Sequence, residues 1–323
     1  MEKMTVRTIA KALGVAHSTV HRALSGKDSV SLKNRRRIIQ YAQEHGYSLP
    51  LNNNCNIAIV VPHFYIFGYL ARVLFHLENE LYLHGYRMIL ISEKNVEILK
   101  DHMFAGIIST VWQESRVLKL PQEYSVPIIS LNAASSMVEN IALVASGSDG
   151  ISLALKFLYS QGCRKIFYVG PSVDKNPIEK EKLEEFRKFC NTHSLKFNNM
   201  YRSVTFSKIA NAIPDILSSG SDAVFCASET YAFNIGRLLQ KQNVRIPEDI
   251  SLMGMEMEEL NTNFDPPITA ISQDFENLAK SAVEMLIAAI EDRTAVKNIR
   301  IPCKLIKRAS VKQLSPAKKD SEI

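Results

Sequence analysis

Residues 5–49, TVRTIAKALGVAHSTVHRALSGKDSVSLKNRRRIIQYAQEHGYSL, decide the fold of the N-terminal part of this chain. Apolar residues recur there at helical spacing in three runs, and Gly14 separates the first run from the second. The runs are Ile9, Ala10 and Leu13, then Val20, Ala23 and Leu24, and finally Ile38 and Ala42. Two helices joined by a tight glycine turn, followed by a third helix at about 31–45, predict a helix-turn-helix.

The positive charge of the chain is concentrated in the same segment. Residues 1–50 hold nine Lys and Arg residues against three acidic residues, which gives a net charge of +6. The whole chain has 39 basic and 33 acidic residues, so the remainder holds 30 of each and is neutral. Because Lys and Arg neutralise phosphates, this distribution predicts that residues 1–50 bind DNA.

Motifs along most of the chain resemble the LacI/GalR family of bacterial transcription regulators. In the N-terminal segment they are Gly14-Val15, Thr19-Val20, Arg22, Leu24, Gly26, Val30-Ser31 and Gly46-Tyr47, with Pro50 one place later than usual. Farther along they are GCRKI (162–166), RIPEDISLMG (245–254), PPIT (266–269) and LIKRAS (305–310). Because the motifs are several and ordered, the resemblance is more specific than a helix-turn-helix alone.

The resemblance implies a set of DNA contacts. His17, Ser18 and Arg22 occupy the positions on the second helix that touch base edges, and an arginine can donate two hydrogen bonds to a guanine. Other hydroxyl and amine groups are placed for phosphate oxygens, which fix register rather than sequence. These are Thr5, Thr19, Ser25, Ser29, Ser31 and Lys33. The alternative interpretation is an ordinary solvated helix surface.

The segment that follows the headpiece departs from the family. Family members carry a longer linker with a hinge helix that inserts a leucine into the minor groove. Here only LNNNCN (51–56) precedes the first strand, and three consecutive asparagines form helices poorly. We therefore predict that no ordinary hinge helix forms. Ala16 also replaces a serine that caps the second helix in the family.

Downstream of residue 56, apolar strands alternate with helical patterns. Strands are expected at 56–62, 86–92, 105–110, 126–132, 165–170, 222–227 and 250–254, and helices at 68–84, 149–161, 178–193, 230–242 and 276–292. The predicted fold class is an all-α helix-turn-helix headpiece plus an α/β, periplasmic-binding-protein-like core with two parallel-sheet lobes. The predicted divisions are a DNA-binding domain (1–48), a linker (49–56), a two-lobed effector-binding and dimerisation domain (57–310) and a disordered tail (311–323). The helix at 276–292 is expected to return to the first lobe.

Composition narrows the function classes. Five cysteines at irregular spacing form no CxxC pair, which favours reduced core residues and no structural zinc. The sequence contains no 18-residue apolar run and no signal-peptide pattern at MEKMTV, so neither a membrane span nor export is expected. The protein is therefore expected in the bacterial cytoplasm, associated with the nucleoid when it is bound to DNA. No catalytic motif is recognised, and no enzyme activity, cofactor or metal is predicted.

By resemblance, the effector binds between the two lobes, at the carboxyl ends of strands. Lys182 stands where many members have an arginine, Ser228 and Glu229 replace an Asn/Ser-Asp pair, and Glu256 replaces an aspartate. Tyr65, Phe67 and Trp112 follow strands and could stack on a sugar ring. The alternatives are loop surface charges and wall packing. Glu185, where a glycine is usual, further departs from a standard sugar site.

Two functions remain open at this stage. The first is a homodimeric regulator, a repressor of carbohydrate-utilisation genes, that binds a double-stranded DNA operator and responds to a small-molecule, sugar-like effector. The second is a DNA-binding regulator whose core has lost small-molecule control and serves for dimerisation or protein binding. Sugar-dependent thermal stabilisation distinguishes the first from the second.

Overall fold

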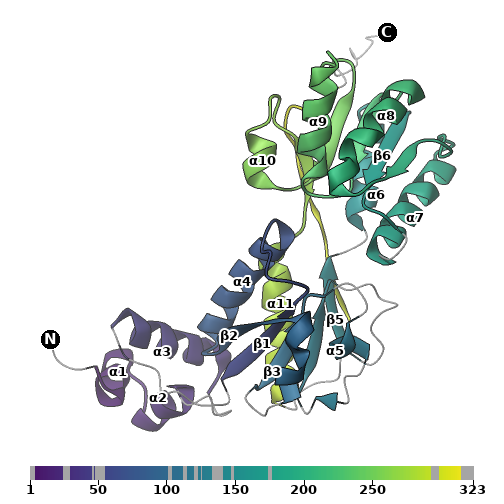
Figure 1. Ribbon diagram of the computed structural model, residues 1–323. Helices are drawn as coiled ribbons and strands as arrows, with labels where there is room; N and C mark the ends of the chain where they lie inside the picture. Colours follow the sequence, from purple (N-terminus) through teal and green to yellow (C-terminus); the bar gives the residue numbers. More distant parts are fainter. Residues whose placement is uncertain are drawn as a thin grey trace. The chain divides into compact units, whose positions relative to one another are not determined.

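The computed structural model divides the chain into two compact units (Figure 1). It describes residues 4–24, 30–45, 47, 55–100, 104–111, 115–119, 123–124, 126–132, 141–146, 149–173, 177–291 and 298–313. The first unit contains residues 1–145 and 275–299, and the second contains residues 146–274 and 300–323. We call residues 4–47 the headpiece, the rest of the first unit the first lobe, and the second unit the second lobe. The hinge prediction and most of the predicted disordered tail, from 314 onward, lie outside the described ranges.

The headpiece consists of three helices, as predicted. They are α1 (Val6–Leu13), α2 (His17–Leu24) and α3 (Leu32–Glu44). Gly14 ends α1 in the left-handed region at φ 65°, where a side chain would be strained. The apolar residues of all three helices form one small core, in which Ile9, Val20 and Ala42 are fully buried. The helical spacing of the apolar residues therefore predicted both the three helices and the residues of their shared core.

The first lobe is built on one sheet whose strand order is β11-β5-β4-β3-β1-β2. Its strands are β1 (Asn56–Val61), β2 (Arg87–Ser92), β3 (Gly106–Ser109), β4 (Ile128–Leu131), β5 (Ala142–Ser146) and β11 (Ile299–Ile301). The pairs from β2 to β5 are parallel. The residues of β1 from Ile57 to Val61 are fully buried. A parallel strand that is covered on both faces needs apolar residues at every position, which explains the uninterrupted apolar run.

Two helices from distant parts of the chain pack together in the first lobe. They are α4 (Tyr69–Leu83) and α11 (Phe275–Ile290), which contact each other along their length (Figure 1). A Cβ at Gly106 of β3 would lie 2.8 Å from Leu286 Cδ1, so glycine is required for this close approach of α11. The prediction that residues 276–292 return to the first lobe is therefore correct. On this lobe the structure adds η1 (Glu93–Lys100) and α5 (Arg116–Lys119), which were not predicted.

The second lobe repeats the plan with the strand order β12-β10-β9-β8-β6-β7. Its strands are β6 (Ile166–Gly170), β7 (Tyr201–Ser203), β8 (Ala223–Cys226), β9 (Ser251–Met255), β10 (Thr269–Ser272) and β12 (Lys304–Ile306). Within the described residues of this sheet, β10 pairs with β12 in antiparallel fashion and the pairs from β10 through β9, β8 and β6 to β7 are parallel. Its helices are α6 (Asp149–Ser160), α7 (Pro177–Thr192), η4 (Phe206–Ala212), α8 (Ile213–Ser219), α9 (Tyr231–Lys241) and α10 (Glu258–Thr262).

Two apolar clusters fill the two faces of this second sheet. One joins Phe167 and Val224 to residues of α8 and α9, and the other joins Tyr168 and Phe225 to residues of α6 and α7. Neighbouring residues of a strand thus enter opposite cores, as the alternation of side chains along a strand requires. The predicted fold class, a helical headpiece and an α/β core with two mainly parallel sheets, is confirmed. No helix in the described ranges combines the length and hydropathy needed to cross a membrane.

Candidate DNA-binding face and effector region

The second helix of the headpiece separates its apolar and polar residues cleanly. Val20, Ala23 and Leu24 are buried in the headpiece core. His17, Ser18 and Arg22 are exposed on α2, and Thr19 is half-buried. The three residues predicted to read base edges therefore share a solvent-facing surface on one short helix. His21, also exposed there, is a further donor that was not among the predicted contacts.

Two of the predicted phosphate-contacting residues, Thr5 and Ser31, lie at helix starts. Thr5 is the N-cap of α1: its hydroxyl accepts a hydrogen bond from the Thr8 amide at 3.2 Å, and the Thr8 hydroxyl accepts from the Thr5 amide at 2.8 Å. The Ser31 hydroxyl accepts a hydrogen bond from the Asn34 amide at 3.4 Å, beside the first turn of α3. These two hydroxyls thus satisfy first-turn amides of α1 and α3. Ser25 and Ser29, and the side chain of Lys33, lie beyond what the structure describes.

The headpiece contacts the first lobe through α3. The Arg35 guanidinium lies 3.7 Å from a carboxylate oxygen of Glu291, just after α11, and both side chains are almost fully buried. The Ile39 side chain lies over Gly85, where a Cβ would approach its Cδ1 to 2.8 Å. Gly85 also has φ 80°, a backbone conformation that favours glycine there. Of the three consecutive arginines, Arg35 therefore has a structural role.

In the second lobe, the residues predicted for the effector follow the carboxyl ends of neighbouring strands. Strands β8 and β9 are parallel, with Cys226 opposite Gly254, so Ser228 and Glu256 emerge at the same edge of the sheet. The ammonium of Lys182, on α7, donates to the Ala227 carbonyl at 3.2 Å and to Glu179 at 2.7 Å. The structure thus brings Lys182 next to the Ser228 segment. Glu229 is half-buried in the turn that precedes α9.

Glu256 is held inside the second lobe. Its two carboxylate oxygens accept hydrogen bonds from the Arg308 guanidinium at 2.8 and 2.6 Å, and a third comes from the Asn261 amide at 3.2 Å. Both charged side chains are mostly buried, with exposed fractions of 5% for Glu256 and 15% for Arg308. The pairing raises the pKa of Arg308 above its ordinary value. These contacts tie the end of β9 to the segment 305–310.

The aromatic residues predicted to line the effector site have different positions. Tyr65 and Phe67 follow β1 in the first lobe, with 75% and 47% of their surfaces exposed and their ring centroids 6.3 Å apart. They form an exposed aromatic pair in the described structure. Trp112 falls in a stretch that the structure does not describe.

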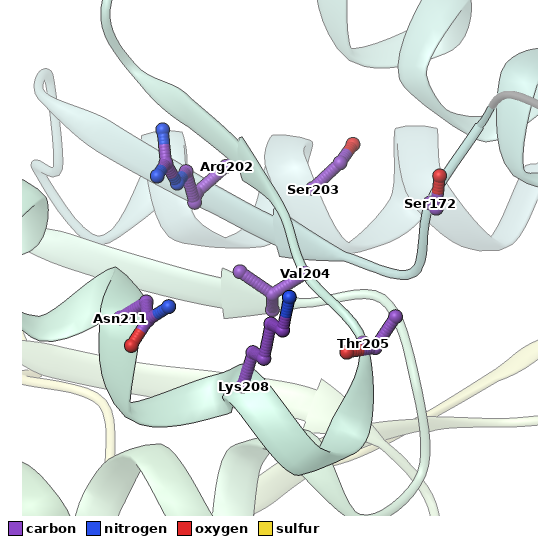
Figure 2. A pocket seen from close by; sticks show the side chains of 7 residues that line it. All are labelled: Ser172, Arg202, Ser203, Val204, Thr205, Lys208 and Asn211. Atoms are coloured by element: carbon purple, nitrogen blue, oxygen red, sulfur yellow. The ribbon is translucent and has the colours of Figure 1, made fainter.

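A pocket that was not predicted opens in the second lobe (Figure 2). It has a volume of about 330 Å³. Its lining residues, drawn in Figure 2, are Ser172, Arg202, Ser203, Val204, Thr205, Lys208 and Asn211. They come from the loop after β6, from β7 and the two residues that follow it, and from η4. Two cationic groups, three hydroxyls and an amide make the pocket rich in hydrogen-bond donors.

One buried tyrosine connects this pocket to the predicted effector segment. Tyr231 begins α9, three residues after Ser228, and its hydroxyl donates to the Val204 carbonyl at 2.8 Å. Burial raises the pKa of Tyr231 to about 12, so the hydroxyl remains protonated and able to donate at neutral pH. Sequence reasoning missed the pocket because its residues lie in a short strand and a 3-10 turn that lack strong periodicity. Their clustering of Arg, Lys, Ser and Thr within 202–208 was the available signal.

Comparison with known proteins identifies two regions of the chain. Residues 5–49 match the model of bacterial regulatory proteins of the lacI family, and residues 155–311 match a periplasmic binding protein-like domain. The transcriptional repressor PurR of Vibrio vulnificus is 25% identical over 96% of this chain and 99% of its own length. The transcriptional repressor CytR of Escherichia coli K12 is 24% identical over 96% of this chain and 97% of its own length.

Solved structures share the fold. A complex of the transcriptional regulator CelR with cellobiose superimposes with a TM-score of 0.72 at 21% identity, covering 95% of this chain and all of that one. The lac repressor dimer bound to operator and the anti-inducer ONPF superimposes with a TM-score of 0.72 at 18% identity. The match covers 96% of this chain and 99% of that one. The family matches therefore show that the chain joins a helix-turn-helix of the lacI family of bacterial regulatory proteins to a periplasmic binding protein-like domain, and the solved structures share this fold.

Proposed function

We propose that this protein is a cytoplasmic transcriptional repressor that binds a roughly palindromic operator as a homodimer. The observation that carries this proposal is the exposed row of His17, Ser18 and Arg22 on α2, backed by a fully apolar inner face. A repressor of this kind needs no catalytic step, so no enzyme activity is part of the proposal. The names of the curated relatives, both repressors, support the direction of control.

The proposed DNA contacts divide by role. Arg22 supplies the strongest base contact, because its guanidinium can donate two hydrogen bonds to one guanine. His17 and Ser18 add shorter-range contacts, and Thr5, Thr19, Ser25, Ser29, Ser31 and Lys33 fix the register on phosphates. Two such headpieces in a dimer would meet half-sites spaced by about one helical turn, roughly 34 Å, or more.

We further propose that a small-molecule, sugar-like effector binds the core, with polar contacts from the second lobe, and controls genes of carbohydrate utilisation. The donor-rich pocket beside Tyr231 suits hydroxyl or anionic groups of such a ligand, and Lys182, Ser228 and Glu229 lie on the adjoining segments. Tyr65, Phe67 and Trp112 remain proposed stacking partners. Glu256 is proposed as an effector contact only because of its position in the motif, since both of its carboxylate oxygens already accept hydrogen bonds from Arg308.

Control of DNA binding requires that the core influence the headpiece. The contacts of α3 with the first lobe, at Arg35–Glu291 and Ile39–Gly85, supply a direct connection that needs no hinge helix. A ligand that favours one arrangement of the core would bias headpiece placement in proportion to its difference in affinity for the two arrangements. The domain divisions proposed from sequence, at residues 48, 56 and 310, are compatible with this connection.

Selection of operator DNA from a random duplex library tests the proposal first. We expect enriched sequences with inverted repeats, and an affinity that falls steeply with salt concentration. Footprinting should then protect two half-sites. Enrichment of single, asymmetric sites would contradict the dimer, and the absence of any enriched sequence would contradict specific DNA binding.

Thermal unfolding against mono- and disaccharides, sugar phosphates and nucleosides tests the effector. A ligand at 100 times its dissociation constant adds about 2.7 kcal/mol to the stability of the state that binds it. Lys208→Ala should weaken binding of the active compound, while Lys241→Ala, outside the pocket at the end of α9, should leave it unchanged. A protein that binds its operator but is stabilised by no compound would contradict control by an effector of these classes.

A further inference from the structure

Three potential metal ligands meet between α4 and α11 in the first lobe. Glu80 lies in the last turn of α4, His84 caps that helix, and Glu284 lies on α11. One ligand atom from each residue lies within 4.8 Å of the other two. His84 Nε2 is 3.1 Å from Glu80 Oε1, and the imidazole is fully buried.

We propose that Glu80, His84 and Glu284 bind a divalent transition-metal ion, with Zn²⁺ and Mn²⁺ as the best-fitting probes. The spacing of Glu80 and His84, four residues apart, places both on one side of α4. One imidazole nitrogen and two carboxylate oxygens form a mixed donor set, which suits Zn²⁺ and the neighbouring first-row ions. Three protein ligands leave the remaining coordination positions to water.

Charge supports this assignment. Two carboxylates are brought together here, and like charges at this separation repel strongly where water is scarce. A divalent cation between the two carboxylates offsets both negative charges. An imidazole that is fully buried beside two carboxylates from separate helices is therefore well placed as a ligand.

The ion would have a structural consequence at the headpiece. It would connect α4 to α11, and His84 directly precedes Gly85, the residue over which Ile39 of α3 packs. Glu291, the partner of Arg35, lies two turns after Glu284. A metal at this position would stabilise the two helix ends on which the headpiece rests. The site itself does not depend on the proposed repressor function, because ligation involves only residues of the first lobe.

Metal binding to the full-length protein tests the proposal. After removal of metal with a chelator, titration calorimetry with Zn²⁺ and separately with Mn²⁺ should reveal one site per chain, and bound Zn²⁺ should raise the unfolding temperature. Glu284→Gln and His84→Gln should each weaken that site by roughly 100-fold or more, since even changes to outer-shell partners cost 10- to 100-fold. Far-UV circular dichroism confirms that each variant is folded.

Two matched variants separate this site from other histidines and carboxylates. His76→Gln and Glu78→Gln lie on the same helix but outside the cluster, and they should bind Zn²⁺ like the unmodified protein. Failure of both ions to bind would overturn the proposal. So would binding that survives Glu284→Gln, or that is lost equally in His76→Gln, because the ion would then be held elsewhere.

Discussion

The polar face of α2 and the Glu256 cluster of the second lobe use charged residues in opposite ways. On α2, His17, Ser18 and Arg22 are exposed above a fully apolar inner face. In the cluster, Glu256 is nearly buried and its oxygens are engaged by Arg308 and Asn261. Both sets were predicted by resemblance to contact a partner, yet only the first presents its groups to solvent.

The difference shows why a motif position does not by itself define a binding residue. A polar side chain can bind a ligand when its donors or acceptors are accessible, whereas a buried charge first needs its own counter-charge. Glu256 meets that need with Arg308, which the sequence motif LIKRAS supplies 52 residues later. We therefore expect loss of Arg308 to affect folding and loss of Arg22 to affect DNA binding.

Arg308→Ala should have the largest effect on stability. Removing one member of a buried ion pair leaves an uncompensated charge and typically costs about 3 to 5 kcal/mol. Urea unfolding of the second lobe, followed by fluorescence or circular dichroism, measures the change. Arg187→Ala removes an exposed ion pair with Glu184 and should cost under about 1 kcal/mol. If the Arg308→Ala protein is stable but no longer binds effector, the Glu256 cluster is a ligand site rather than a structural ion pair.

Ile9→Ala should have the next largest effect, and it should be confined to the headpiece. Ile9 is fully buried in a core of few residues, and such truncations typically cost about 2 to 5 kcal/mol. We expect loss of operator binding with unchanged ligand stabilisation of the core, measured by gel shift and thermal unfolding. Leu13→Ala, at a half-buried position beside the same core, is the milder control. Equal losses in both variants would show that burial does not set the effect.

The sequence predicted those elements that have a clear local period of apolar residues. It did not predict contacts between residues that lie far apart along the chain. The three headpiece helices, four strands of the first sheet (β1 to β4) and three of the second (β6, β8 and β9) followed from local apolar patterns, and the structure contains them. Short strands such as β7 and β12 were missed, since three residues carry little pattern. The same limit applied to side-chain partners. The spacing of Glu80 and His84 is visible in the sequence, but nothing local indicates that Glu284, 200 positions later, lies beside them.

Arg22→Ala should weaken operator binding without lowering stability. A bidentate arginine–guanine contact contributes about 1 to 3 kcal/mol of discrimination, which corresponds to a roughly 5- to 150-fold loss of affinity. Competition gel shifts with operators altered at single base pairs measure both affinity and specificity. The variant should lose preference at one position of each half-site. Lys11→Ala, on the exposed side of α1, is the control for a general effect of lost charge. A uniform loss across all sequences would instead assign Arg22 to phosphate contact.

Thr5→Ala should have the smallest effect, and it sharpens the comparison because Thr5 has two possible roles. Loss of an N-cap hydroxyl typically costs about 1 kcal/mol of stability, and Thr5 and Thr8 form a reciprocal capping box. Thr5→Ser keeps the hydroxyl and should restore both stability and DNA affinity, whereas Thr5→Asn keeps a good cap but changes the group that meets a phosphate. If Thr5→Asn restores stability but not operator affinity, the hydroxyl also contacts DNA. If it restores both, the role of Thr5 is confined to the cap, and its contribution to binding comes only through the position of α1.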